Sequence, residues 1–215
     1  MLMLTQGPLF ALRDRPLADP VARAAALRPG YRDHAIDLGD PRGADPIVEV
    51  RDYGIAGANA YFTGVAPYHQ RIAVNVRLKP YGLELWVFDA WRPLSIQNHF
   101  HDQWMPDRLR ALHPDWDAAR IASETERYWA RGGNGAVDPL SPPPHATGAA
   151  VDLTIRYRNG AELFMGTIFD DVSDASNTGA FESDPDGLAF SIREARSNRR
   201  LLYWLMDDAG FANNP

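Results

Sequence analysis

The feature that most constrains the fold is a short apolar segment that ends in a charged motif. Residues 83–89, Leu-Glu-Leu-Trp-Val-Phe-Asp, follow turn residues at 79–82 and lead into Ala-Trp-Arg-Pro. Aliphatic and aromatic residues in a run of this length favour a β-strand. Such a strand leaves Arg92 just beyond its end, where a rigid backbone can direct a guanidinium into a cleft.

A second strand is predicted close to a histidine. Residues 148–155 alternate so that Asp152 lies on the face opposite the apolar side chains, and the loop at 132–144 leads into His145. The turn between His145 and Asp152 can bring the imidazole and the carboxylate toward one point, a pairing that suits zinc. A solvated loop histidine and an aspartate satisfied by backbone donors would show the same spacing, so the spacing alone leaves both interpretations open.

Other segments complete an α+β pattern. The sequence predicts a strand at 47–53 and helices at 19–27, 68–78, 95–113, 115–129 and 188–209, with an interruption near Pro106. We expect a single α+β domain in which a small, mainly antiparallel sheet carries the site and helices pack beside it. Residues 1–45, rich in Pro, Gly, Arg and Asp, are predicted to form an arm packed on a core domain at 46–215.

Composition narrows the kind of ligand. Hydrophobic residues make up 45% of the 215-residue chain, enough to bury one sizeable core. The formal charge of -6 argues against nucleic acid and anionic membrane, because both favour a basic patch, so a small solute is the expected ligand. The chain has no cysteine, which excludes disulfides and thiolate chemistry. It shows no signal-peptide pattern and no run of about 20 apolar residues, so a cytoplasmic location is expected.

Arg92 is the candidate for stabilising negative charge. Arginine stays charged and presents a planar fork of donors. Such a group suits the oxyanion that develops when water attacks a peptide carbonyl. The alternative is a structural arginine that pairs with Asp89 or with a helix end.

Several blocks in order carry a family resemblance. The chain resembles the D-alanyl-D-alanine dipeptidases, the zinc peptidases that include the vancomycin-resistance dipeptidases. The blocks lie between residues 61 and 211 and are Tyr-Phe-Thr-Gly at 61–64, the strand and Asp-Ala-Trp-Arg-Pro at 82–93, His-Ala-Thr-Gly-Ala-Ala-Val-Asp-Leu-Thr at 145–154, Met-Gly-Thr-Ile-Phe-Asp at 165–170, and Asn-Arg-Arg-Leu-Leu at 198–202 leading to Ala-Gly-Phe at 209–211.

The resemblance implies a zinc-dependent hydrolase that cleaves D-alanyl-D-alanine, with one Zn²⁺ per chain in the complete protein. It implies that His145 and Asp152 are two of three zinc ligands and that Arg92 stabilises the transition state. It also implies that Asp170 holds the free amine of the substrate. Without the resemblance, Asp170 has the character of a solvated loop carboxylate. Pro143 and Pro144 stand where the family tends to have serines.

The same resemblance implies a Glu-x-x-His segment, which supplies the general base and the third ligand, within a few residues after Pro215. The sequence to residue 215 does not contain it, and the remaining histidines (His34, His69, His99, His101 and His113) have the character of surface or packing residues. Two functions are therefore considered. One is a zinc dipeptidase of cell-wall precursor metabolism, and the other is a truncated, non-catalytic protein that binds or senses a dipeptide.

Overall fold

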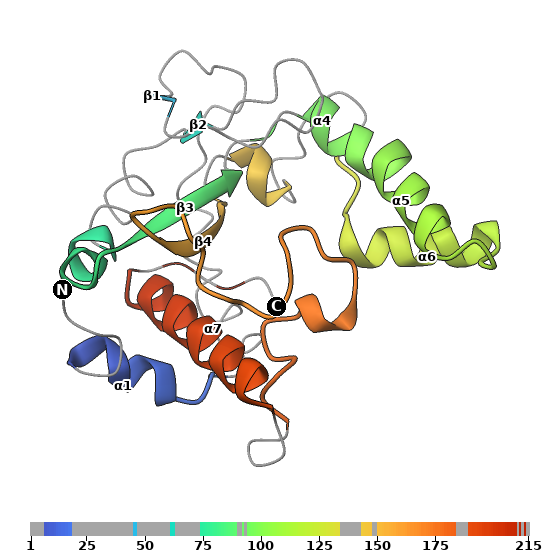
Figure 1. The fold of residues 1–215 in the computed structure, drawn as a ribbon. Coiled ribbons are helices and arrows are strands. Elements are labelled where there is room, and N and C mark those ends of the chain that lie inside the picture. The colour runs from blue at the N-terminus through green and yellow to red at the C-terminus, as the bar shows by residue number, and fades with distance from the viewer. Residues whose placement is uncertain are drawn as a thin grey trace. The chain divides into compact units, whose positions relative to one another are not determined.

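The computed structural model describes residues 7–18, 45–46, 61–62, 74–89, 92, 94–133, 143–147, 150–183, 189–209, 211 and 213. Its strands are β1 (Asp45–Pro46), β2 (Tyr61–Phe62), β3 (Leu83–Asp89) and β4 (Asp152–Tyr157). Its labelled α-helices are α1 (Pro8–Asp14), α4 (Leu94–His99), α5 (Met105–Leu112), α6 (Ala118–Tyr128) and α7 (Phe190–Asp208) (Figure 1), and residues 74–78, within the helix predicted at 68–78, are also helical. The shorter helices are 3-10 helices at Lys79–Tyr81, Pro144–Thr147 and Asp174–Ser176 and a π-helix at Phe100–Trp104.

Two small sheets and several helices confirm the α+β class. In the sheet of β1 and β2 the strands run antiparallel, with Asp45 opposite Phe62. The second sheet pairs β3 with β4. The N–H of Arg158, just after β4, donates to the carbonyl of Gly82, just before β3, at 3.1 Å, so these strands also run antiparallel. The strand predicted at 83–89 is confirmed at both ends, whereas β4 begins at Asp152 instead of residue 148.

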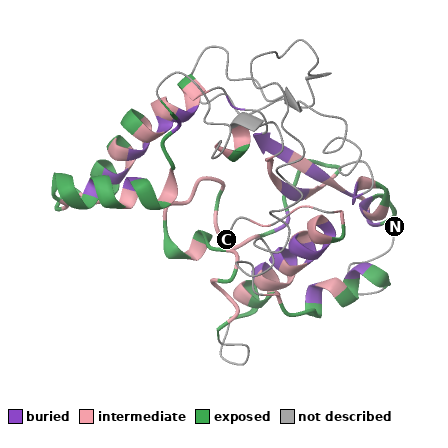
Figure 2. Ribbon diagram, turned by 180° about the vertical axis from the view of Figure 1, so that it is seen from behind, coloured by how far each residue is buried: buried purple, intermediate pink, exposed green. Residues whose placement is uncertain are grey.

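The chain divides into two compact units, one of residues 1–34, 66–86 and 153–215 and the other of residues 35–65 and 87–152. The first unit contains an apolar core that draws on the start of β3, on β4 and on α7. Figure 2 shows the buried residues of α7 along the helix. The core consists of Leu9, Val74, Leu78, Tyr81, Leu83, Leu85, Ile155, Leu163, Leu201 and Leu205.

Helix α1 packs against α7 in the first unit. Leu9 is buried in the core, and the Arg13 guanidinium donates to Glu194 at 2.6 Å and to Asn198 at 3.2 Å. The sequence did not predict this helix, although Pro8 in its first turn is a favourable start. The helix predicted at 19–27 and the strand predicted at 47–53 lie outside the described residues. The boundary between an arm and a core at residue 45 stays a prediction.

Arg199 on α7 holds the segment that follows β4. Burial lowers the pKa of Arg199 from its usual value, against the attraction of the Asp171 carboxylate, which raises it. Its guanidinium donates to three main-chain carbonyls, at 2.6–2.7 Å, from Met165, Ala175 and Asn177. A single buried side chain therefore fixes both ends of the loop at 165–177.

We expect Arg199→Met to destabilise the protein by about 3–5 kcal/mol, because it removes charged donors and leaves the carbonyls of the loop without partners. Urea unfolding of the variant measures the loss. Arg193→Met, on the exposed side of α7, is the matched control and should change stability by less than about 0.5 kcal/mol. Equal stability of the two variants would contradict the role assigned to Arg199.

The second unit contains α4, the π-helix, α5 and α6. Phe100, Trp104 and Trp129 form an aromatic group, with centroid distances of 4.8–5.9 Å. The interruption predicted near Pro106 takes the form of the π-helix at Phe100–Trp104, whose wider turn accommodates a proline that cannot donate to residue 102. Helix α6 is capped by Asp117, which accepts from the Arg120 N–H at 2.8 Å, and not by Asp115.

Among the helices of the described residues, none combines the length and hydrophobicity needed to cross a lipid bilayer.

Candidate metal centre

The end of β3 places Asp89 and Arg92 together in the second unit. Both residues are buried, and the Arg92 Nε and Nη2 atoms lie 2.7 Å and 2.6 Å from Asp89 Oδ2. Asp89 and Arg92 are only three positions apart in the sequence, which keeps the two side chains close along the chain. The pairing with Asp89 that the sequence left open as an alternative is therefore present.

Arg92 also reaches beyond this pair. Its Nη1 donates to Gln97 Oε1 at 2.8 Å, and its Nη2 lies 3.4 Å from Asp152 Oδ2. The main-chain N–H of Arg92 donates to the carbonyl of His145 at 3.1 Å. This main-chain bond joins the segment after β3 to the segment before β4. Arg92 therefore pairs with Asp89 and also lies beside Asp152.

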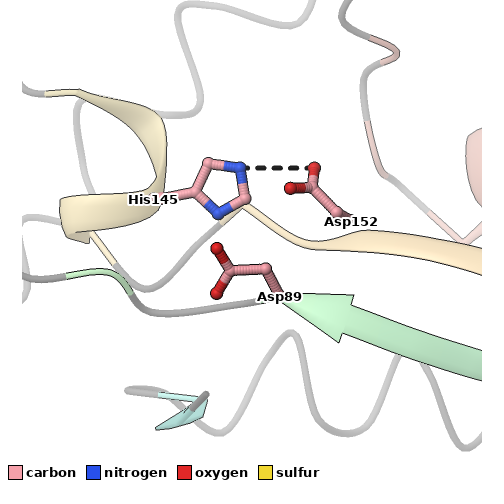
Figure 3. A group of neighbouring side chains, drawn as sticks. All are labelled: Asp89, His145 and Asp152. Atoms are coloured by element: carbon pink, nitrogen blue, oxygen red, sulfur yellow. Dashed lines mark ion pairs between the residues drawn. The ribbon is translucent and has the colours of Figure 1, made fainter. Parts of the chain in front are cut away.

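His145 and Asp152 meet as the sequence predicted. The 3-10 helix Pro144–Thr147 carries His145, and Asp152 is the first residue of β4. The His145 Nε2 and Asp152 Oδ1 atoms are 3.3 Å apart, and their side chains are 16% and 36% exposed. Figure 3 shows the imidazole with the carboxylates of Asp89 and Asp152 on two of its sides. The pair is therefore partly shielded from water.

The protonation of the pair follows from competing effects. Burial opposes the charged form of His145, but attraction to Asp152 and Asp89 is stronger, so the pKa of His145 is raised above its usual value. Burial likewise opposes ionisation of Asp152, but attraction to His145 and Arg92 is stronger, so its pKa is lowered. Both pKa shifts thus share one main favourable cause, the attraction between the His145 imidazolium and the Asp152 carboxylate. A divalent cation held by these atoms would take the place of the imidazole proton.

The donor set fits zinc. One ligand atom each from Asp89, His145 and Asp152 lie within 4.8 Å of one another. Two atoms that are each about 2.0–2.1 Å from one tetrahedral zinc are separated by about 3.3–3.4 Å. The 3.3 Å between His145 and Asp152 matches this separation. Asp89 belongs to the same group, but its Oδ2 already accepts from Arg92.

Sequence reasoning missed Asp89 as a member of the group of possible metal ligands that it forms with His145 and Asp152. The available signal was its position at the strand end, three residues before Arg92 and on a strand that pairs with the one that begins at Asp152. Gln97 was also missed, and the sequence offered no signal for it beyond its proximity to Arg92.

Asp170 lies in the first unit, within the loop that Arg199 holds. Its φ of 59° is in the left-handed region, which among non-glycine residues is more accessible to Asp and Asn than to most others. The side chain is half-buried. Its assignment to the substrate amine stays a prediction.

Comparisons with known proteins identify the family of this chain. The family described as D-ala-D-ala dipeptidase matches residues 66–215. The D-alanyl-D-alanine dipeptidase of Synechocystis sp. is 28% identical over 201 residues, which cover 83% of this chain and 80% of the relative. No solved structure gave a significant match. Because the family match covers well over half of the chain, the protein belongs to the D-ala-D-ala dipeptidase family of peptidases.

Proposed function

We propose that the protein hydrolyses the D-alanyl-D-alanine dipeptide to D-alanine with the help of one zinc ion. The observation that carries the proposal is the 3.3 Å pair of His145 and Asp152, set beside Arg92, in a chain of this family. The name of the Synechocystis relative supports the same substrate. The reaction belongs, in this proposal, to cell-wall precursor metabolism in the cytoplasm.

His145 and Asp152 are the residues that hold the ion. When bound, zinc supplies a Lewis acid for the substrate carbonyl and lowers the pKa of water, so that hydroxide is available near neutral pH. Its third protein ligand and the general base are expected from the predicted Glu-x-x-His segment. Asp89 does not replace them in this assignment, because its carboxylate accepts from Arg92.

Arg92 faces the ligand pair and donates to the substrate oxygen that becomes negative as water adds to the carbonyl. Its charge is already balanced by Asp89, so the guanidinium is in place before the substrate arrives. Asp170 provides the carboxylate for the free amine of the dipeptide.

Removal of zinc is the direct test. The complete protein should release D-alanine from D-alanyl-D-alanine, and dialysis against a chelator should lower the rate by about 10³-fold, because the metal contributes several kcal/mol to the transition state. Added Zn²⁺ should restore the rate, whereas Mg²⁺, which prefers oxygen ligands in an octahedron, should not. Coupled detection of D-alanine measures all three rates.

L-alanyl-L-alanine is the matched control substrate and should be cleaved far more slowly. A zinc-loaded protein that binds D-alanyl-D-alanine without releasing D-alanine would contradict the proposal and would favour a non-catalytic, dipeptide-binding role.

A further inference from the structure

Gln97 on α4 is a buried amide whose two ends are both engaged. It is 6% exposed, its Oε1 accepts from Arg92 Nη1 at 2.8 Å, and its Nε2 donates to the main-chain carbonyl of Ala130 at 2.6 Å. Arginine only donates and a carbonyl only accepts. The opposite orientation of the amide would set like groups against each other at both ends, so the orientation of Gln97 is fixed.

The carbonyl that anchors Gln97 is itself held in place. Gly132, two residues after Ala130, is buried against α4, and a Cβ at this position would lie 2.8 Å from Leu94 Cδ2 and 2.9 Å from Asn98 Oδ1. A side chain at residue 132 would therefore have to displace the side chains of Leu94 and Asn98 on α4. The carbonyl that Gln97 contacts thus belongs to a segment that packs against side chains of α4.

The guanidinium of Arg92 is restrained on every side that the structure describes. Its Nε and Nη2 contact Asp89, its Nη1 contacts Gln97, and its Cζ lies 4.8 Å from the centroid of the Trp129 ring and 5.4 Å from that of Phe100. Rotation about the Nε–Cζ bond would break the contact with Gln97. Together with the two contacts to Asp89, the contact with Gln97 keeps Nη2 directed toward Asp152.

We propose that Gln97 is a positioning residue for the hydrolysis, one that holds the Arg92 guanidinium in the orientation needed to meet the developing oxyanion. The proposal rests on the function proposed above. It assigns to α4 and to the segment after α6 a role in the reaction, although neither contributes a metal ligand. Asp89 holds the Nε and Nη2 side of the guanidinium through one oxygen, Oδ2, and Gln97 holds the Nη1 side.

Gln97→Met tests the proposal, because methionine has a similar length but no hydrogen-bonding amide. The kcat should fall by about 10–100-fold, since small misplacements of an oriented group have effects of this size. The KM and the zinc content should stay within about twofold, because Gln97 contacts neither the metal nor the ground-state substrate in this assignment. Gln103→Met, an exposed glutamine on the π-helix of the same segment, is the control and should leave kcat unchanged.

A phosphinate analogue of the dipeptide, which mimics the tetrahedral species, gives a binding readout. Its Kd should rise in Gln97→Met by the same factor by which kcat falls. In an Arg92→Lys background, Gln97→Met should have almost no further effect, because the group it orients is absent. A full additional loss in that background would overturn the proposal, as would a variant that only unfolds more easily with its kcat intact.

A measurement without substrate separates this proposal from the proposed function. In the wild type, hindered rotation should give two resolved NMR signals for the Arg92 Nη1 and Nη2 groups, assigned by their loss in Arg92→Lys. In Gln97→Met the two signals should merge. Unchanged signals in Gln97→Met would overturn the role of Gln97. If the signals merge in Gln97→Met but the wild type releases no D-alanine, only the proposed function is overturned.

Discussion

Replacement of His145 by alanine is expected to abolish both zinc retention and dipeptide hydrolysis. The imidazole supplies the nitrogen ligand of the group formed by Asp89, His145 and Asp152. Its loss leaves Asp152 and the expected third ligand, and two protein ligands hold zinc much more weakly than three. After dialysis the zinc content should fall by at least about tenfold, and kcat/KM should fall by about 10³-fold or more. Elemental analysis and D-alanine release measure the two effects.

His113→Ala is the matched control. Its ring stacks on Trp116 with centroids 3.7 Å apart, and it contacts none of the residues proposed to hold zinc. Circular dichroism of both variants checks that the fold is intact. If His145→Ala kept its zinc and its rate after dialysis, His145 would not be a ligand.

The sequence predicted the part of the site that is local along the chain. His145 and Asp152 are seven positions apart, so a short turn and the start of a strand suffice to bring them to 3.3 Å. Asp89 and Gln97 were not predicted, because their contacts with Arg92 depend on side-chain directions that sequence spacing does not give. The two roles considered for Arg92, partner of Asp89 and neighbour of the ligands, are compatible, because one guanidinium has enough donors for both.

In the fold, too, features set by neighbouring residues were predicted, whereas contacts between residues far apart in the sequence were not. Strand β3 was predicted to the residue, because an apolar run lies between a left-handed Gly82 and a charged motif. The start of α6 was predicted two residues too early, since Asp115 and Asp117 are both suitable caps and packing selects the second. The hydrogen bonds from Arg199 to the loop at 165–177 could not be predicted. Their acceptors are main-chain carbonyls 22–34 residues earlier, which leave no sequence pattern.

Replacement of Arg92 should separate catalysis from structure. Arg92→Lys keeps the charge, but an ammonium is a compact group that cannot reach Asp89, Gln97 and Asp152 together. We expect kcat to fall by about 10²–10³-fold, as for loss of one oxyanion donor, with little change in KM or zinc content. Steady-state kinetics and elemental analysis on the same preparation measure these quantities.

The contribution of Arg92 to stability is tested by replacing both Arg92 and Asp89 with uncharged residues. Arg92→Met leaves the Asp89 carboxylate, 8% exposed, without its counter-ion, so the variant should lose about 3–5 kcal/mol of stability. Adding Asp89→Asn removes that uncompensated charge and should restore most of the stability in urea unfolding, while kcat stays low because no donor faces the substrate. If the double variant regained its kcat together with its stability, Arg92 would only support the fold, and the oxyanion would have to be stabilised by another residue.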